Sequence, residues 1–123
     1  MSARILVVDD VPANVKLLEA RLSAEYFDVL TASNGAEALD ILTREQGAFD
    51  LLLTDIQMPV MDGITLVKNL RTMPDYKFTP LLMLTTESTP EKKMEGKSAG
   101  ATGWLIKPFN PDQLVTTIKR VLG

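Results

Sequence analysis

The stretch FDLLLTDIQMPVMDG, from Phe49 to Gly63, is the most informative about the fold, because three leucines and a threonine lead into an aspartate, Asp55. A short apolar run of this kind is typical of a buried β-strand. Such a strand would hold Asp55 rigidly at the rim of a sheet, and Asp62 would cap the helix that follows the turn. The stretch therefore predicts a strand that delivers a carboxylate to a defined place.

Similar Leu-rich or β-branched runs alternate with helical patterns along the 123 residues. The alternation predicts β-α-β units, and hence a parallel sheet with helices on both faces. The pattern uses the whole chain, so residues 1–123 are expected to form a single domain of (βα)5 architecture. The predicted strands are residues 4–8, 27–31, 49–54, 80–85 and 103–107.

The segments between these strands carry apolar residues at helical spacing, and Pro12, Pro90 and Asn110 mark helix starts. The segment around Gly96 has the weakest pattern, because glycine disfavours a helix by about 1 kcal/mol relative to alanine. The expected inward residues are Val11, Val15, Leu18 and Leu22; Ala38, Leu39 and Leu42; Ile64, Val67 and Leu70, continued by Arg71 to Met73; Met94 and Ala99; and Leu114, Val115, Ile118, Val121 and Leu122.

Composition excludes several classes of function. The 13 basic and 16 acidic residues give a net charge of -3 without a basic block, which argues against direct nucleic-acid binding. The absence of cysteine and histidine excludes disulfides, Cys and His catalysis and the usual zinc sites. The apolar run from Ile5 to Val8 is too short for a signal peptide or a membrane span, so a cytoplasmic protein without a membrane partner is expected.

Polar residues follow the predicted strands: Asp9 and Asp10, Asp55, Thr85 and Thr86, and Lys107. Taken singly, each aspartate is more often a helix cap or a turn former. Parallel strands end at one edge of a sheet, however, and carboxylates that converge there repel one another unless a cation lies among them. Magnesium suits such oxygen ligands. A carboxylate beside magnesium, a lysine and a hydroxyl indicates a phosphoryl acceptor.

Four motifs in order, VVDD (7–10), LLTDIQMPVMDG (52–63), LMLTT (82–86) and GWLIKPF (103–109), carry a family resemblance. The chain resembles the response-regulator receiver domain of two-component signalling over essentially its whole length. The resemblance implies a flavodoxin-like (βα)5 three-layer fold with a parallel five-stranded sheet in the order 2-1-3-4-5.

The resemblance also implies a role for each matching residue. Asp55 is the phosphoacceptor, and it binds magnesium together with Asp10 and the backbone carbonyl of Gln57. Asp9 binds the metal mainly through water. Lys107 pairs with the phosphoryl group, as its matching position does in the family.

Further positions belong to the switch and to the lifetime of the phosphoryl group. By the resemblance, Thr85 is the switch hydroxyl, and Trp104 is the switch aromatic whose ring turns inward on activation. The bond from Lys107 to Pro108 is expected to be cis. Thr86 departs from the small residue usual beside the switch threonine and narrows access to the site, whereas Gln57 and Glu87 are the positions that tune dephosphorylation.

These implications predict a phosphoacceptor switch rather than a classical enzyme. A sensor histidine kinase, a phosphotransfer protein or a small acyl phosphate would phosphorylate Asp55 and thereby change the target affinity of a face formed by the fourth helix, fifth strand and fifth helix. The protein is expected to be a monomer or a weak phosphorylation-dependent dimer.

Three alternatives remain open. A receiver-like scaffold with a dead switch is one, and a small aspartyl phosphatase or phosphotransferase is another, although Gln57 replaces the second aspartate of that class's D-x-D motif. The N-terminal part is similar to receivers of diguanylate cyclase regulators, and the C-terminal part to single-domain chemotaxis regulators. A chimeric or engineered chain is therefore the third hypothesis.

Overall fold

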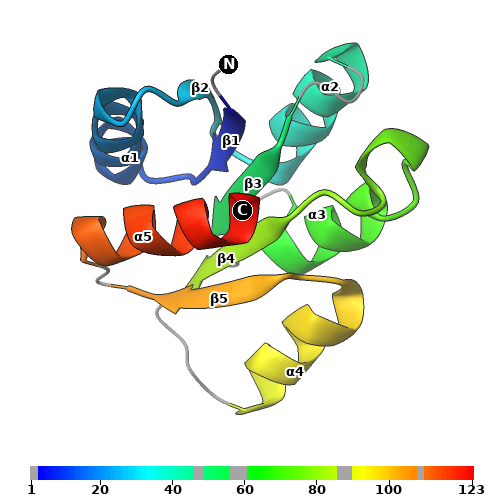
Figure 1. The fold of residues 1–123 in the computed structure, drawn as a ribbon. Coiled ribbons are helices and arrows are strands. Elements are labelled where there is room, and N and C mark those ends of the chain that lie inside the picture. Colours follow the sequence, from blue (N-terminus) through cyan, green and yellow to red (C-terminus); the bar gives the residue numbers. More distant parts are fainter. Residues whose placement is uncertain (1–2, 46–48, 56–60, 86–89, 108–109) are drawn as a thin grey trace.

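A computed structural model describes residues 3–45, 49–55, 61–85, 90–107 and 110–123. Strands and helices alternate throughout, with one short 3-10 helix, η1, between α3 and β4 (Figure 1). The elements are β1 (Arg4–Val8), α1 (Pro12–Ala24), β2 (Asp28–Ala32), α2 (Gly35–Glu45), β3 (Leu51–Asp55), α3 (Gly63–Leu70), η1 (Pro74–Tyr76), β4 (Leu81–Thr85), α4 (Pro90–Ala99), β5 (Gly103–Ile106) and α5 (Pro111–Leu122).

The five strands form one parallel sheet in the order β2-β1-β3-β4-β5. Helices α1 and α5 cover one face and α2, α3 and α4 the other, which gives three layers (Figure 1). The flavodoxin-like fold and the strand order expected from the family resemblance are thus confirmed.

Successive side chains along each strand point to opposite faces of the sheet, which divides the core into two clusters. In β1, Ile5 and Val7 pack with α1 and α5, whereas Leu6 and Val8 pack with α2 and α3. Every residue of β3 and β4 is buried, because helices cover both faces of the sheet. The Leu-rich runs are the sequence signature of this double burial, and they hold the ends of β3 and β4 rigidly.

Local signals for helix starts are confirmed at four helices. Pro12 lies in the first turn of α1, and α4 begins at Pro90. The Asp62 carboxylate accepts a hydrogen bond of 2.7 Å from the Thr65 N–H and caps α3. The Asn110 side chain likewise accepts from the Asp112 N–H at 2.8 Å and caps α5. Each cap satisfies a backbone donor that has no partner within its own helix.

Helix α1 ends in a Schellman motif that has tyrosine at the left-handed position. Tyr26 has a φ of 68°. Its N–H donates to the Ser23 carbonyl, and the Phe27 N–H donates to the Leu22 carbonyl. Glycine is the usual residue here, since a Cβ disfavours positive φ. The motif turns the chain sharply into β2.

Some predicted inward residues were wrong. Val11 precedes α1 and is 42% exposed. Helix α3 ends at Leu70, so Arg71 and Thr72 do not continue its buried face, whereas Met73 packs against the core just before η1 begins at Pro74. On α4, Met94 is 70% exposed, and Gly96 lies inward instead because the Trp104 ring occupies the space beside it. In the described part of the chain, no helix is long and apolar enough to cross a membrane.

Candidate functional site

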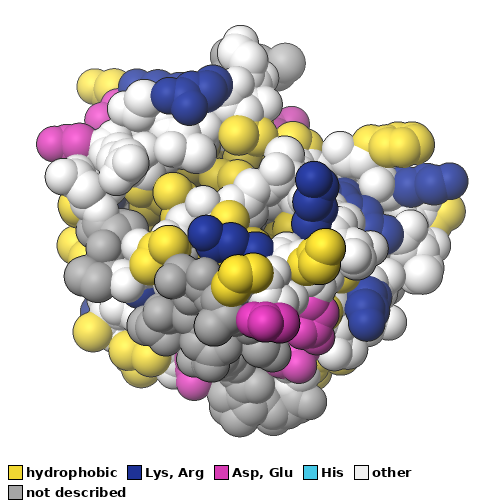
Figure 2. Space-filling model, turned by 90° about the horizontal axis from the view of Figure 1, so that it is seen from below, with side chains coloured by type: hydrophobic (Ala, Val, Ile, Leu, Met, Phe, Trp, Pro, Cys, Tyr) yellow, Lys and Arg dark blue, Asp and Glu magenta, His cyan; other side chains and the backbone are white. Residues whose placement is uncertain are grey.

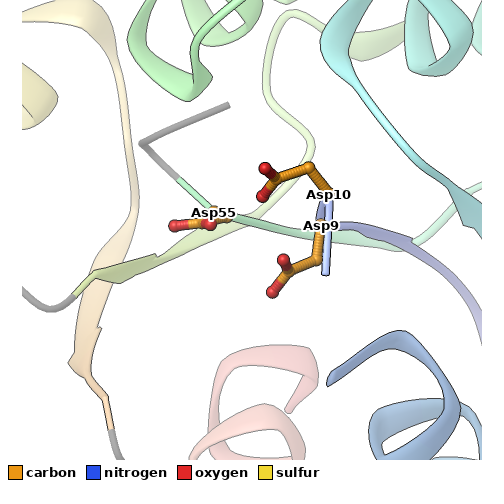
Figure 3. A group of neighbouring side chains, drawn as sticks. All are labelled: Asp9, Asp10 and Asp55. Carbon is orange, nitrogen blue, oxygen red and sulfur yellow. The ribbon is translucent and has the colours of Figure 1, made fainter. Parts of the chain in front are cut away.

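The carboxyl ends of β1 and β3 bring three aspartates together (Figure 3). These strands are neighbours, and Val8 pairs with Thr54, so the residues that follow, Asp9 and Asp55, lie side by side. One carboxylate oxygen of each of Asp9, Asp10 and Asp55 lies within 4.8 Å of the others. Asp9 and Asp55 are only 1% and 6% exposed, whereas Asp10 is partly exposed at the rim.

Lys107, directly after the edge strand β5, brings a positive charge to this acidic cluster. Its Nζ lies 3.0 Å from Asp9 Oδ2 and 3.3 Å from Asp55 Oδ2. The Lys107 backbone N–H donates to the Thr85 carbonyl at 2.7 Å, which anchors the residue at the end of β4. The cluster therefore has three carboxylates and one ammonium group, which pairs with two of them.

The pKa of Lys107 is raised above its ordinary value. Burial by itself lowers this pKa, but the hydrogen bond to Asp9, the negative charges of Asp55 and Asp9, and the hydrogen bond to Asp55 together outweigh burial. Lys107 is consequently a cation at neutral pH.

Both oxygens of Asp9 accept hydrogen bonds from the protein. Asp9 Oδ1 accepts from the Val11 N–H at 3.0 Å, and Oδ2 accepts from Lys107 Nζ at 3.0 Å and Asn14 Nδ2 at 3.4 Å. Asn14, in the first turn of α1, was not predicted. Its only sequence signal is a polar residue five positions after Asp9 within a helix start, which by itself does not reveal the contact.

The acidic cluster fits a hard divalent cation. Its donors are carboxylate oxygens, as magnesium requires, and its three negative charges exceed the single positive charge of Lys107. A cation at the rim, beside Asp10 and Asp55, would relieve the remaining repulsion.

The two predicted switch residues within the described part of the chain lie on β4 and β5. Thr85 ends β4 and is buried. Trp104, in β5, pairs with Met83 and packs against the core on the side of α4. Gln57, Thr86, Glu87 and Pro108 lie outside the described residues, so their expected roles stay predictions.

Comparison with known proteins decides the family. The model of the family described as response regulator receiver domain matches residues 5–119. The chain belongs to this family. Receiver domains are signalling switches of two-component systems rather than classical enzymes, and they bind magnesium at an acidic pocket.

Relatives of this receiver include complete regulators and solved domains. It is 40% identical to response regulator PleD of Caulobacter vibrioides over 97% of the chain and 26% of PleD, so it spans about a quarter of that relative. The structure of Vibrio cholerae chemotaxis protein CheY4 matches with 47% identity and a TM-score of 0.93, covering 98% of this chain and 99% of CheY4.

A third relative is the receiver domain of the sensor histidine kinase PA1611 from Pseudomonas aeruginosa, whose structure has a magnesium ion coordinated in the active-site cleft. It matches with 27% identity and a TM-score of 0.90, covering 100% of this chain and 99% of that chain.

The chimera hypothesis gains no support, because PleD and CheY4 each match this receiver over nearly its whole length rather than over one half.

Proposed function

We propose that this receiver is a magnesium-dependent phosphoacceptor switch in which Asp55 takes the phosphoryl group. The observation that carries the proposal is the convergence of Asp9, Asp10 and Asp55 within 4.8 Å, with Lys107 paired to two of them. Phosphoryl transfer requires positioning and charge neutralisation rather than an elaborate catalytic apparatus. The acidic cluster and its lysine are suited to both.

Asp10, Asp55 and the carbonyl of Gln57 would hold the magnesium ion, with Asp9 acting mainly through water. The hydrogen bonds that Asp9 accepts from Val11, Asn14 and Lys107 support this division, because they occupy both of its oxygens. Bound magnesium would supply positive charge against the oxygens of the transferring group.

In the proposed reaction, an Asp55 carboxylate oxygen forms a bond to phosphorus while the bond to the leaving group breaks. With an acyl phosphate the leaving group departs as a carboxylate, and with a phosphohistidine it departs as an imidazole. Lys107 neutralises a second phosphoryl oxygen, and the Thr85 hydroxyl donates a hydrogen bond to the third. Water later hydrolyses the aspartyl phosphate, which restores Asp55 and releases inorganic phosphate.

In this proposal the protein is cytoplasmic, and the donor is a sensor histidine kinase, a phosphotransfer protein or a small acyl phosphate. Residues 1–123 act as one receiver domain that promotes only its own phosphorylation and dephosphorylation. The family assignment supports a kinase or phosphotransfer partner.

We assign target binding to the face formed by α4, β5 and α5. A cavity of about 240 Å³ between α4 and β5 is lined by Lys93, Lys97 and Trp104, among others. Met94 is exposed on α4, as is Ile106 on β5. Figure 2, which views the molecule from the α4 side, shows Lys and Arg side chains interspersed with hydrophobic ones, and a smaller group of Asp and Glu side chains beside them. This chemistry suits a protein segment that carries both acidic and apolar side chains.

The test is the intact mass of the protein after incubation with magnesium and acetyl phosphate. We expect the parent to gain one phosphoryl group and Asp55→Asn to gain none. Asp40→Asn, which removes an exposed carboxylate on α2, is the matched control and should behave as the parent. The gain should disappear when EDTA replaces magnesium.

Two outcomes contradict the proposal. An equal mass gain in Asp55→Asn would assign the acceptor elsewhere, and no gain in a parent that magnesium stabilises would favour the scaffold alternative.

A further inference from the structure

Gly96 lies where the ring of Trp104 meets α4. A Cβ built on Gly96 would overlap Trp104 Cζ3, and would lie 3.2 Å from Trp104 Cη2 and 3.1 Å from Met83 Sδ. Gly96 is buried within the helix, and it is not one of the glycines with positive φ among the described residues. The backbone therefore does not require glycine at this position, whereas the indole ring does.

Glycine is a poor choice for the middle of a helix on other grounds. It forms helices less readily than alanine, and α4 has few apolar residues of its own to hold it on the sheet. Contact between the ring and the α4 backbone therefore takes the place of a side chain at this position. The inward position of Trp104 depends on that missing side chain.

In the inward position of the ring, one polar group of Trp104 lacks a hydrogen bond to the described part of the chain. The indole N–H of Trp104 is buried and has no hydrogen-bond partner within the described residues. A buried donor without a partner is unfavourable, and an outward ring would regain water. The cavity lined by Lys93, Lys97 and Trp104 lies next to the ring and leaves room for it to move. Packing against Gly96 and Met83 therefore opposes hydration of the N–H.

We propose that Gly96 is a positioning residue that holds the ring of Trp104 in its inward orientation. A methyl group at position 96 would push the ring out of its site on α4 toward the lysine-lined cavity. The consequence for signalling rests on the proposed function: the outward ring would alter the α4-β5-α5 face without any change at Asp55.

Fluorescence tests the proposal directly, since Trp104 is the only tryptophan in the chain. We expect Gly96→Ala to shift the emission maximum to longer wavelength and to raise the acrylamide quenching constant at least twofold. Ser98→Ala, at an exposed position of the same helix, is the matched control and should match the parent. Parent-like emission and quenching in a folded Gly96→Ala variant would overturn the proposal.

A stability comparison keeps the test decisive should Gly96→Ala fold poorly. Urea midpoints from circular dichroism would be compared for Gly96→Ala in the parent and in Trp104→Leu. Without the ring, alanine should raise the midpoint through its helix propensity; with the ring, that rise should be absent or reversed. Equal rises in both backgrounds would refute a role for the ring. Neither measurement uses magnesium or a phosphoryl donor, so failure of Asp55 to accept phosphate would leave this result standing.

Discussion

Lys107 is the residue on which the electrostatics of the acidic cluster depend. It forms ion pairs with Asp9 and Asp55, both almost fully buried, while Asp10 adds a third negative charge at the rim. Buried carboxylates without a partner would be strongly unfavourable, so the lysine makes the cluster tolerable in the folded protein. Lys107 alone does not neutralise the third negative charge. Electrostatic repulsion therefore remains within the cluster, and a bound cation can relieve it.

Removing that third charge should make the metal-free protein more stable and should weaken its binding of magnesium. We expect Asp10→Asn to raise the free energy of unfolding without divalent cations by about 1 kcal/mol, the repulsion between unit charges about 4 Å apart in a water-like dielectric. Magnesium should stabilise the parent by mass action but should stabilise the variant much less. Urea unfolding with and without magnesium measures both effects.

Asp75→Asn is the control, because Asp75 is exposed in η1 and lies outside the acidic cluster. An Asp10→Asn variant that magnesium stabilises as much as the parent would show that Asp10 is not a metal ligand.

At the scale of elements, Arg71 joins the end of α3 to two other segments. Its guanidinium donates to the carbonyls of Tyr76 at 2.9 Å and Thr79 at 2.7 Å, more weakly to that of Lys77, and twice to that of Gly100 at 2.8 and 3.1 Å. Burial lowers the pKa of Arg71 from its ordinary value. One side chain thus ties α3 and the segment before β4 to the turn after α4.

Lysine should not replace this arginine, although it keeps the charge. We expect Arg71→Lys to lower the free energy of unfolding by about 2 kcal/mol, because hydrogen bonds from charged donors contribute roughly 1.5 to 3 kcal/mol each and a single ammonium cannot span both segments. Urea unfolding is the measurement. Arg120→Lys, exposed on α5, should be nearly neutral; equal losses in the two variants would contradict the role of Arg71.

At the scale of the whole molecule, the strand order determines which residues can meet. Strands β1 and β3 are central neighbours, so Asp9 and Asp55 face one another, and Lys107 extends from the edge strand β5 past β4 to reach both. Residues almost a hundred positions apart are brought together by the parallel topology. The lysine consequently links the C-terminal part of the sheet to its centre.

The stabilisation that Lys107 contributes through this link should depend on pH in a defined direction. The folded-state pKa of Lys107 is raised above 10.5, so its stabilisation is fully present below about pH 10.5 and is lost as pH rises through the raised value. Relative to the parent, Lys107→Met should lower the free energy of unfolding by about 2 kcal/mol at pH 8, the scale of a charged hydrogen bond. That difference should stay constant to about pH 10 and shrink above it.

Urea unfolding at a series of pH values measures this dependence, with Lys68→Met on the exposed face of α3 as the control. A difference that grows above pH 10.5 would have the wrong sign for a stabilising lysine.

Local patterns were sufficient for much of the fold and for the strand-end residues. The runs in β3 and β4 are buried on both faces, and this double burial is visible in a sequence as uninterrupted apolar residues. The caps at Asp62 and Asn110 act within three residues of themselves, so their signals are also local. Asp9, Asp55 and Lys107 could be predicted to converge because parallel strands share an edge.

The contacts that could not be predicted join residues that are distant in the sequence. Nothing near Arg71 reveals that Gly100 will accept its hydrogen bonds, and Asn14 becomes a partner of Asp9 only through the orientation of α1. The periodicity of α4 favoured Met94 as an inward residue, yet Gly96 lies inward because Trp104 comes from β5 to fill the space. The sheet and the charges at its edge could be predicted from short stretches of sequence, because they follow from local periodicity. Packing in three dimensions decided which side chains meet, because excluded volume and hydrogen-bond geometry act between atoms that are close in space, whatever their separation along the chain.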